Sequence, residues 1–185
     1  MDLTPGQQMS LVDRIVAIHL SLQRARLPHA FGGALALAWC TQRARGTIDI
    51  DVNVFVSGDR MGEVLAGLPD GVKLDDAGRH HLERDGQARL WWDATPVDLF
   101  LNTTDFHVAA SGRARTESFA GLNVPFLACR DLAVFKAFFN RTKDWADLEE
   151  MHAAGELDIE AVAGVLVRYL GTDDQRLARL LSLHS

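Results

Sequence analysis

The sequence predicts an α+β fold, with a mixed β-sheet core flanked by helices and a C-terminal α-helical extension. Up to residue 128, helical spacing of apolar residues alternates with short β-branched and aromatic runs, and from Cys129 onward every apolar pattern is helical. The chain has 185 residues, 48% of them hydrophobic, which suits one compact unit. Because no Pro- or Ser-rich linker interrupts it, we expect a core over 1–128 and a helical subdomain over 129–185 packed on it.

The first elements follow from apolar spacing and from glycine and proline. A helix is predicted over 10–26, capped by Ser10 and ended before Pro28. "HAFGG" predicts a short strand that runs into a tight glycine turn, and "ALALAWCTQRA" predicts the next helix. Gly46 ends that helix, and a strand is predicted from Ile48 to Val56.

The middle of the chain predicts one short helix over 59–68 and then several strands. "RHHLERDGQARLWW" indicates a hairpin that turns at Asp85-Gly86, since Asp-Gly is a strong hairpin signal. Further strands are predicted over 96–103 and as an extended pair within 114–127. The helices of the extension are predicted over 130–141, 143–155, 158–171 and 173–183.

Charge and cysteine content narrow the class of protein. The formal net charge of −6 argues against a broad basic surface for nucleic acid, although it leaves room for a local basic pocket. Cys40 and Cys129 form no CxxC pair and have no metal-ligand spacing, so we expect buried free thiols. We expect a cytoplasmic protein with no membrane partner, because no apolar run could span a bilayer and "MDLTPGQQMS" is unlike a signal peptide.

Two acids in one apolar strand are the clearest chemical signal. Side chains alternate between the faces of a strand, so Asp49 and Asp51 project from one face, about 7 Å apart. Ile48, Ile50 and Val52 would point into the core from the other face. Two carboxylates this close repel each other unless a cation lies near them. Hard divalent ions such as Mg²⁺ take oxygen ligands, so Asp49 and Asp51 are candidate metal ligands.

A third acid would complete a metal site for phosphoryl or nucleotidyl transfer. Asp98 has the same setting, an aspartate within the apolar strand "PVDLFL", and a neighbouring strand would bring it beside the first pair. It is also the candidate to accept a proton from an attacking hydroxyl. Asp93 competes for this role and ranks second, because "WDATP" predicts a turn.

A glycine pair lies at the junction between the first strand and the second helix. Gly32 and Gly33 would let the backbone approach a phosphate closely, and the following helix would offer free N–H groups and a positive dipole end. Four features follow one another: a glycine turn, a helix, an Asp-x-Asp strand and a later strand aspartate. Together they indicate a nucleotide-binding site more specifically than any one of them does.

This ordered set resembles the nucleotidyltransferase superfamily with the DNA polymerase β-like catalytic fold. The string "GGALALAWCTQRARGTIDIDVNVFV" looks like one branch of it, the AbiEii/AbiGii-type nucleotidyltransferase toxins and the minimal nucleotidyltransferases. In that branch an Arg-x-Thr precedes the Asp-Ile-Asp, and Arg45 and Thr47 occupy those places. The chain departs from the pattern in a longer spacing between Gly33 and Asp49, and in having Ala34 where some members have a phosphate-binding serine.

A second match lies in "RDLAVFKAFFNRTKDWADLEEM". It resembles the family segment in which a helical lysine precedes an Arg-x-Lys-Asp-x-x-Asp string. The matching positions are Lys136, Arg141, Lys143, Asp144 and Asp147. The resemblance implies that the three cations contact the triphosphate. Asp144 is counted with the substrate-binding set, although it also suits a helix cap, and Asp147 suits a pair with a basic neighbour.

The resemblance implies transfer of a nucleoside monophosphate from an NTP to an acceptor, with release of pyrophosphate. One or two Mg²⁺ ions would be held by Asp49, Asp51 and Asp98. The acceptor would be a tRNA 3′ end or a protein, in a toxin–antitoxin setting with a cognate antitoxin as partner. Two alternatives stay open: an aminoglycoside-type antibiotic nucleotidyltransferase, and a non-catalytic nucleotide-binding or antitoxin-like protein with the same fold.

Overall fold

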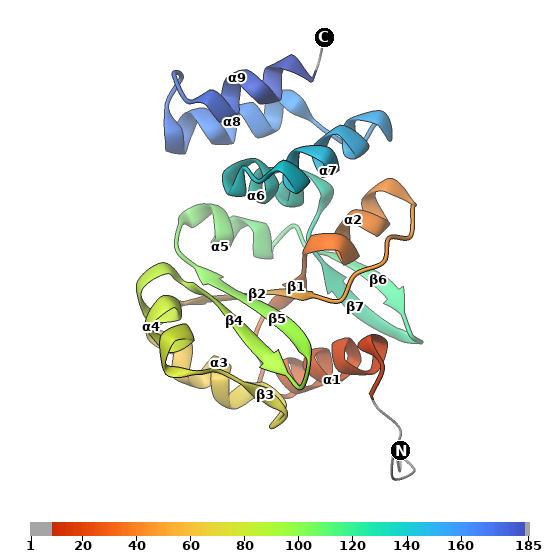
Figure 1. Ribbon diagram of the computed structural model, residues 1–185, viewed down its shortest axis with the longest axis vertical. Helices are drawn as coiled ribbons and strands as arrows, with labels where there is room; N and C mark the ends of the chain where they lie inside the picture. The colour runs from red at the N-terminus through yellow and green to blue at the C-terminus, as the bar shows by residue number, and fades with distance from the viewer. Residues whose placement is uncertain (1–8, 184–185) are drawn as a thin grey trace.

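A mixed β-sheet of seven strands lies at the centre of the computed structural model, which describes residues 9–183 (Figure 1). The strands are β1 His29–Phe31, β2 Ile50–Ser57, β3 Val72–Lys73, β4 Gln87–Trp92, β5 Thr95–Asn102, β6 Arg115–Phe119 and β7 Leu122–Phe126. Their order across the sheet is β3-β4-β5-β2-β1-β7-β6. The pairs β2/β5 and β1/β7 are parallel and the others are antiparallel, so the predicted mixed sheet is confirmed.

Helices cover both faces of this sheet. They are α1 Leu11–Arg24, α2 Gly33–Thr41, α3 Met61–Gly67 (preceded by the 3₁₀ turn Gly58–Arg60), α4 Asp76–Asp85, α5 Asp105–Ser111, α6 Cys129–Phe139, α7 Thr142–Ala153, α8 Ile159–Leu170 and α9 Gln175–Ser182. In Figure 1, α1 and α3 lie on one side of the sheet, and α2, α5 and α6 lie on the other. The helices α8 and α9 stack beyond α6, farthest from the sheet. The predicted α+β class with a helical C-terminal extension is confirmed.

The predicted hairpin at Asp85-Gly86 is wrong, because the residues before the turn form α4. Asp75 caps this helix, its carboxylate accepting a hydrogen bond of 2.7 Å from the Gly78 N–H. Gly86 ends the helix in the left-handed conformation, with φ of 67°. An Asp-Gly pair serves a hairpin turn and a helix C-terminus equally well. The hairpin of this region is β4–β5, which turns at Asp93 and Ala94.

The acid-bearing strand begins later than predicted. β2 starts at Ile50, and Ile48, which was expected in the core, is 75% exposed. Residues 43–49 form an irregular segment between α2 and β2. Asp49 therefore lies just outside the strand, whereas Ile50, Val52 and Val54 are fully buried. The short helix α5 was also not predicted.

One hydrophobic core joins the sheet to the C-terminal helices. It extends from Phe31 and Phe126 in the sheet, through Trp145 of α7, to Leu166 of α8, all of them at most 1% exposed. Burial of this continuous apolar surface is the main force that holds the extension to the sheet. The helices α6 to α9 thus share their core with the strands.

A disulfide bond links Cys40 at the end of α2 to Cys129 at the start of α6. The two Cα atoms are 5.6 Å apart, although 89 residues separate the cysteines in sequence. The prediction of free thiols is wrong, because the fold brings together two helix ends whose proximity no local pattern reveals.

Among residues 9–183, none of the helices is long and apolar enough to cross a membrane.

Candidate active site

Asp51 of β2 and Asp98 of β5 lie side by side at the centre of the sheet. The two strands are parallel, and their register pairs Asp51 directly with Asp98. Both residues are partly buried, and their side chains share one face because strand side chains alternate. The structure therefore brings the predicted third acid beside the Asp-x-Asp strand. Asp93, the competing candidate, lies in the β4–β5 turn and pairs with Arg14 of α1 at 2.8 Å.

Asp49 stands at the entrance to β2, beside these two acids. The Thr47 hydroxyl lies 3.2 Å from both the backbone N–H and the carbonyl oxygen of Asp49, and this contact shapes the segment that leads into the strand. The Asp49 side chain is 27% exposed. Thr47 was predicted to bind substrate, and in the structure its hydroxyl contacts the backbone of Asp49.

An arginine that the sequence did not single out holds two of the three acids. Arg89 of β4 lies opposite Asp98 in the antiparallel register and donates two hydrogen bonds of 2.7 Å to its carboxylate oxygens. The same guanidinium is 3.7 Å from Asp49. A bidentate pair of this kind is among the stronger polar contacts in proteins. Asp98 is thus neutralised by a resident cation.

Asp51 is a buried carboxylate with two other acids near it. The pKa of Asp51 is raised to about 6, mainly by burial and also by the neighbouring Asp98 and Asp49, whereas Lys136 and Lys143 oppose the rise. A carboxylate in this state is stabilised by any cation that reaches it. Lys143 is exposed and lines none of the three cavities described below, so its effect on Asp51 is through space.

The glycine turn is built around Asp51. Gly32 donates a backbone hydrogen bond of 2.9 Å to the Asp51 carbonyl oxygen, which ties the end of β1 to β2. Gly33 has φ of 52° and begins α2. A Cβ on Gly33 would overlap the Asp51 carboxylate, so both the backbone angle and the available space require glycine. The two predicted motifs, glycine pair and Asp-x-Asp, therefore form one structural unit.

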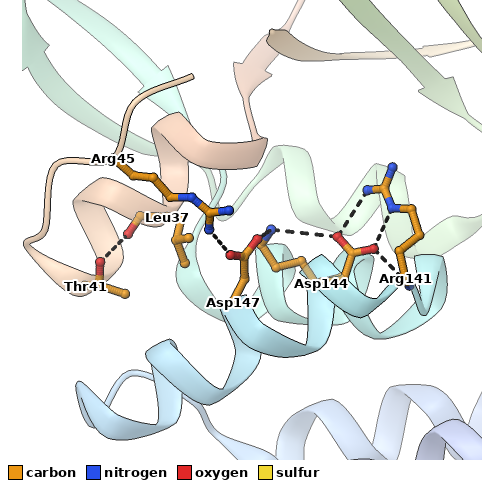
Figure 2. A network of polar contacts seen from close by, with 7 residues as sticks. Leu37, Thr41, Arg45, Arg141, Asp144 and Asp147 are labelled. Carbon is orange, nitrogen blue, oxygen red and sulfur yellow. Dashed lines mark hydrogen bonds and ion pairs between the residues drawn. The ribbon is translucent and has the colours of Figure 1, made fainter. Parts of the chain in front are cut away.

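Two of the predicted phosphate-binding cations, Lys136 and Arg141, belong to a partly buried ion network (Figure 2). The Lys136 ammonium lies 2.5 Å from a carboxylate oxygen of Asp147 and 4.0 Å from Asp144. Arg45, from the segment after α2, pairs with Asp147, and Arg141 pairs with Asp144 at 2.7 Å. Lys136 is 6% exposed. It is therefore a buried lysine, whereas its sequence alone would also allow a lysine that faces solvent.

This network carries one surplus positive charge. Arg45, Lys136 and Arg141 supply three cations, whereas Asp144 and Asp147 supply two carboxylates. The Asp144 carboxylate is 1% exposed, and its hydrogen bond to the Arg141 guanidinium raises the pKa of that arginine. Asp144 and Asp147 thus hold the cations in place. Of this network, Arg45 and Asp147 do not line the cavities near Asp51.

Three adjoining cavities surround these residues. The glycine crevice, of about 40 Å³, is lined by Gly32, Gly33, Asp51, Asn53, Lys136 and Arg141. The acid-lined cleft, of about 490 Å³, has a polar lining that includes Asp51, Asp75, His81, Asp85, Arg89, Trp91, Asp98 and Arg141. The aromatic cavity, of about 220 Å³, is lined mainly by Phe100, Phe106, Phe135, Phe138, Phe139 and Tyr169. Phe100 and Phe139 line all three, with ring centroids 5.6 Å apart, so the cavities meet at this pair.

The acids suit a hard divalent cation in their chemistry but are not gathered around one. The pKa of Asp51 is raised by burial and by the two neighbouring acids, and a cation bound beside it would oppose both effects. Within the part of the chain that the structure describes, however, no three His, Cys, Asp or Glu side chains converge closely enough to hold a metal ion. Arg89 occupies the carboxylate of Asp98 instead. Asp49 and Asp51 are the carboxylates that would hold the metal ion, and Asp98 would join them only after releasing Arg89.

Sequence reasoning missed Arg89 and the contribution of Trp91. Both project from β4 into the acid-lined cleft, and the Trp91 ring is 46% exposed there. Their alternation with Leu90 and Trp92 was visible in "QARLWW", but their partners depend on the β4–β5 register. Asn53, which follows Asp51 on the same face of β2, reaches the glycine crevice as a neutral neighbour.

The mixed sheet, with its aspartates paired across β2 and β5 and a glycine turn against them, has the nucleotidyltransferase fold. ANT(2'')-Ia, an antibiotic-resistance factor, has this fold: its solution structure superposes with a TM-score of 0.61 at 20% sequence identity, covering 94% of this chain and 96% of that one. A crystal structure of ANT(2'')-Ia in complex with adenylyl-2''-tobramycin gives a TM-score of 0.61 at 17% identity, covering 96% and 100%. An antigenic nucleotidyltransferase-like protein from Paracoccidioides brasiliensis gives 0.46 at 12% identity, covering 92% and 86%. No protein-family model matches the sequence, and no curated protein matches it.

Proposed function

We propose that this protein is a Mg²⁺-dependent nucleotidyltransferase, which moves a nucleoside monophosphate from an NTP to an acceptor and releases pyrophosphate. One observation carries the proposal: Asp51 and Asp98 are in register on parallel strands, and Gly33 is packed against the Asp51 carboxylate. The glycine turn that could bind phosphate therefore lies directly beside the pair of acids. The fold shared with ANT(2'')-Ia supports the same reading.

Each residue has a role in this proposal. Asp49 and Asp51 hold the metal ion, which when bound neutralises charge on the phosphate oxygens. The Gly32-Gly33 turn and the surplus positive charge around Lys136 and Arg141 receive the triphosphate at the inner end of the cleft. Asp98 takes the proton of the attacking hydroxyl. Because Arg89 holds both oxygens of Asp98, the acid has to exchange this guanidinium first.

The acceptor we propose is a tRNA 3′ end or a protein hydroxyl, in a toxin that a cognate antitoxin restrains. The support is the resemblance of the Arg45-x-Thr47 and Asp-Ile-Asp string to the AbiEii/AbiGii-type branch. The acid-lined cleft offers the exposed Trp91 ring beside Asp98, a surface on which a nucleotide base of an acceptor strand can stack.

The test is transfer of label from α-³²P NTPs to bacterial tRNA or protein in the presence of Mg²⁺. We expect transfer with the wild type and its loss in Asp51→Asn and Asp98→Asn. Asp93→Asn is the matched control, since Asp93 is an aspartate of the same hairpin but pairs with Arg14 outside the site, so it should keep transfer. Absence of transfer to every acceptor, or transfer that survives Asp51→Asn, contradicts the proposal.

A second candidate is modification of a cationic antibiotic. The acid-lined cleft carries four carboxylates, from Asp51, Asp75, Asp85 and Asp98, near the position proposed for transfer, and such a lining suits a polyamine acceptor. The ANT(2'')-Ia structure with adenylyl-2''-tobramycin provides the comparison. Expression of the chain in a susceptible host, with Asp51→Asn as control, separates the candidates: only this one predicts a raised aminoglycoside tolerance that depends on Asp51.

A further inference from the structure

The walls of the aromatic cavity are formed mainly by aromatic side chains. Phe100 comes from β5, Phe106 from α5, Phe135 and Phe138 from α6, and Tyr169 from α8. Ring pairs across it are tilted or edge-on, with Phe106 and Phe135 centroids 5.4 Å apart and Phe138 and Tyr169 centroids 6.0 Å apart. Such walls offer ring faces and edges, against which a planar aromatic ligand packs favourably.

Asp85, the carboxylate that lines the cavity, is already paired with Arg84, so the cavity offers a ligand no free charge. The Tyr169 hydroxyl donates to Asp105, which Arg168 also holds. The Thr104 hydroxyl lies 2.9 Å from Nδ1 of His107, and burial lowers the pKa of that histidine, which keeps the ring neutral. A charged ligand group would gain no counter-ion here, whereas an uncharged ring loses little by leaving water.

The three cavities differ in the chemistry of their walls. The glycine crevice, with Lys136 and Arg141, suits a phosphoryl group. The acid-lined cleft has the largest volume of the three and contains Asp98, so it suits an acceptor. The aromatic cavity is left for the third moiety, the nucleobase. Its volume of about 220 Å³ is below the ~300 Å³ of the smallest drug-sized pockets, so it fits one ring system and not a whole nucleotide.

We propose that the aromatic cavity binds the nucleobase of the NTP and selects purines over pyrimidines by ring area. This inference rests on the proposed function, because it takes the phosphates to lie at the glycine crevice. Stacking contacts the face of the base and makes few hydrogen bonds to its edge, so it distinguishes bases mainly by ring size. ATP and GTP should therefore bind with similar affinity, and both should bind more tightly than CTP and UTP.

The test compares binding of inorganic tripolyphosphate with that of non-hydrolysable ATP, GTP, CTP and UTP analogues by isothermal titration calorimetry at fixed Mg²⁺. Tripolyphosphate reports the phosphate site alone. We expect the purine analogues to bind roughly tenfold more tightly than tripolyphosphate, the gain that stacking on an aromatic wall provides.

Two variants locate that gain in the cavity. Thr103→Trp fills the cavity from an exposed position, and Phe138→Leu removes a ring but keeps apolar bulk. Both should abolish the purine advantage and leave tripolyphosphate binding unchanged. Val108→Trp is the matched control, since Val108 is 61% exposed on α5 and lines none of the three cavities.

The outcomes separate this inference from the proposed function. If tripolyphosphate binds but the purine analogues bind no better, or if Thr103→Trp leaves ATP binding intact, the cavity is not the base site and the inference fails alone. If neither tripolyphosphate nor any nucleotide binds, the phosphate site fails, and the proposed function and the inference are overturned together.

Discussion

Gly33 and Asp51 constrain each other at the scale of single residues. The carboxylate occupies the space in which any other residue at position 33 would place its Cβ, and Gly33 has a left-handed backbone angle. Local strain of this kind is typical of functional sites, and it persists only where the surrounding structure holds it in place. The sequence predicted both motifs, but only the structure shows that the Asp51 carboxylate leaves no space for a side chain at position 33.

Gly33→Ala should destabilise the protein by at least about 1–3 kcal/mol, because it adds a strained backbone angle and displaces the Asp51 carboxylate. Gly46→Ala is the matched control, since nothing lies within 4 Å of a Cβ at that position. Urea unfolding of the two variants provides the measurement. Equal stability of the two would mean that the Asp51 side chain moves away without cost.

Arg89 pairs with Asp98, the proposed proton acceptor, and lies near Asp49, one of the proposed metal ligands. Arg89→Gln removes one positive charge from beside Asp98 and Asp49, so we expect Mn²⁺, as a probe for Mg²⁺, to bind about tenfold or more tightly. Electron paramagnetic resonance of free Mn²⁺ measures this affinity without reference to turnover. Arg84→Gln is the control, because Arg84 is 69% exposed and pairs with Asp85. Unchanged or weaker Mn²⁺ binding in Arg89→Gln would show that the guanidinium does not compete with the metal.

The positions of the three acids could be predicted from the sequence only in part. Period-two alternation and one assumption of strand adjacency were enough to place Asp51 beside Asp98. Arg89 required the exact β4–β5 register, which is set by the two-residue turn at Asp93 and Ala94. Because the hairpin was predicted at Asp85-Gly86 instead, the partner of Asp98 could not be identified.

At the scale of elements, α1 is joined to β1 by a buried pair of histidines. Nδ1 of His19 lies 2.9 Å from Nε2 of His29, and Nδ1 of His29 lies 2.8 Å from the Leu27 carbonyl oxygen. The carbonyl accepts the His29 Nδ1–H, so Nε2 of His29 accepts from His19, and both rings are neutral. The pKa of His29 is lowered to about 4, mainly by burial and in smaller part by the neighbouring His19, whereas the hydrogen bond to Leu27 raises it.

This pair should make stability depend on pH. The folded pKa of His29 lies below its ordinary value of 6.5, so the stability contributed by the neutral ring is complete above pH 6.5 and is lost as the pH falls towards 4. We expect a loss of about 2–3 kcal/mol at pH 4. His29→Gln should remove that part of the pH dependence in urea unfolding, whereas His152→Gln, at an exposed site, should not. Parallel pH profiles for the wild type and His29→Gln would contradict the assignment.

Prediction of the elements failed where one signal suits two structures. Asp85-Gly86 ends a helix as readily as it turns a hairpin, and the strongly polar α4 has few apolar residues to reveal its period. Strong apolar periodicity made α1 and the C-terminal helices predictable, and the extended pair β6–β7 was predicted too. The packing of Lys136 between Asp144 and Asp147 could not be predicted, since it depends on how α6 meets α7.

At the scale of the whole molecule, the disulfide joins the helix that begins at the glycine turn to the helix that carries Lys136. Closing a loop of this length restricts the unfolded chain, an effect worth about 4–5 kcal/mol in the chain-entropy model and typically 2–4 kcal/mol when measured. Disulfides are uncommon in the reducing cytoplasm, so this bond argues against the predicted cytoplasmic location.

Reduction with dithiothreitol should therefore lower the free energy of unfolding by about 2–4 kcal/mol. The Cys40→Ala/Cys129→Ala double variant should show a similar loss and no further response to reductant. Urea unfolding with and without dithiothreitol measures both effects. An identical unfolding midpoint in the oxidised and reduced wild type would contradict a stabilising role.

The same bond limits how far the molecule extends when it is pulled apart from its two ends. Strands β2 to β7 all lie between Cys40 and Cys129, so tension applied at the termini bypasses them while the bond is intact. Roughly 300 Å of chain, at about 3.3–3.6 Å per residue, stays hidden from the force. A single molecule stretched between its termini should release this length only after reduction, so its extension would report the redox state of the protein directly.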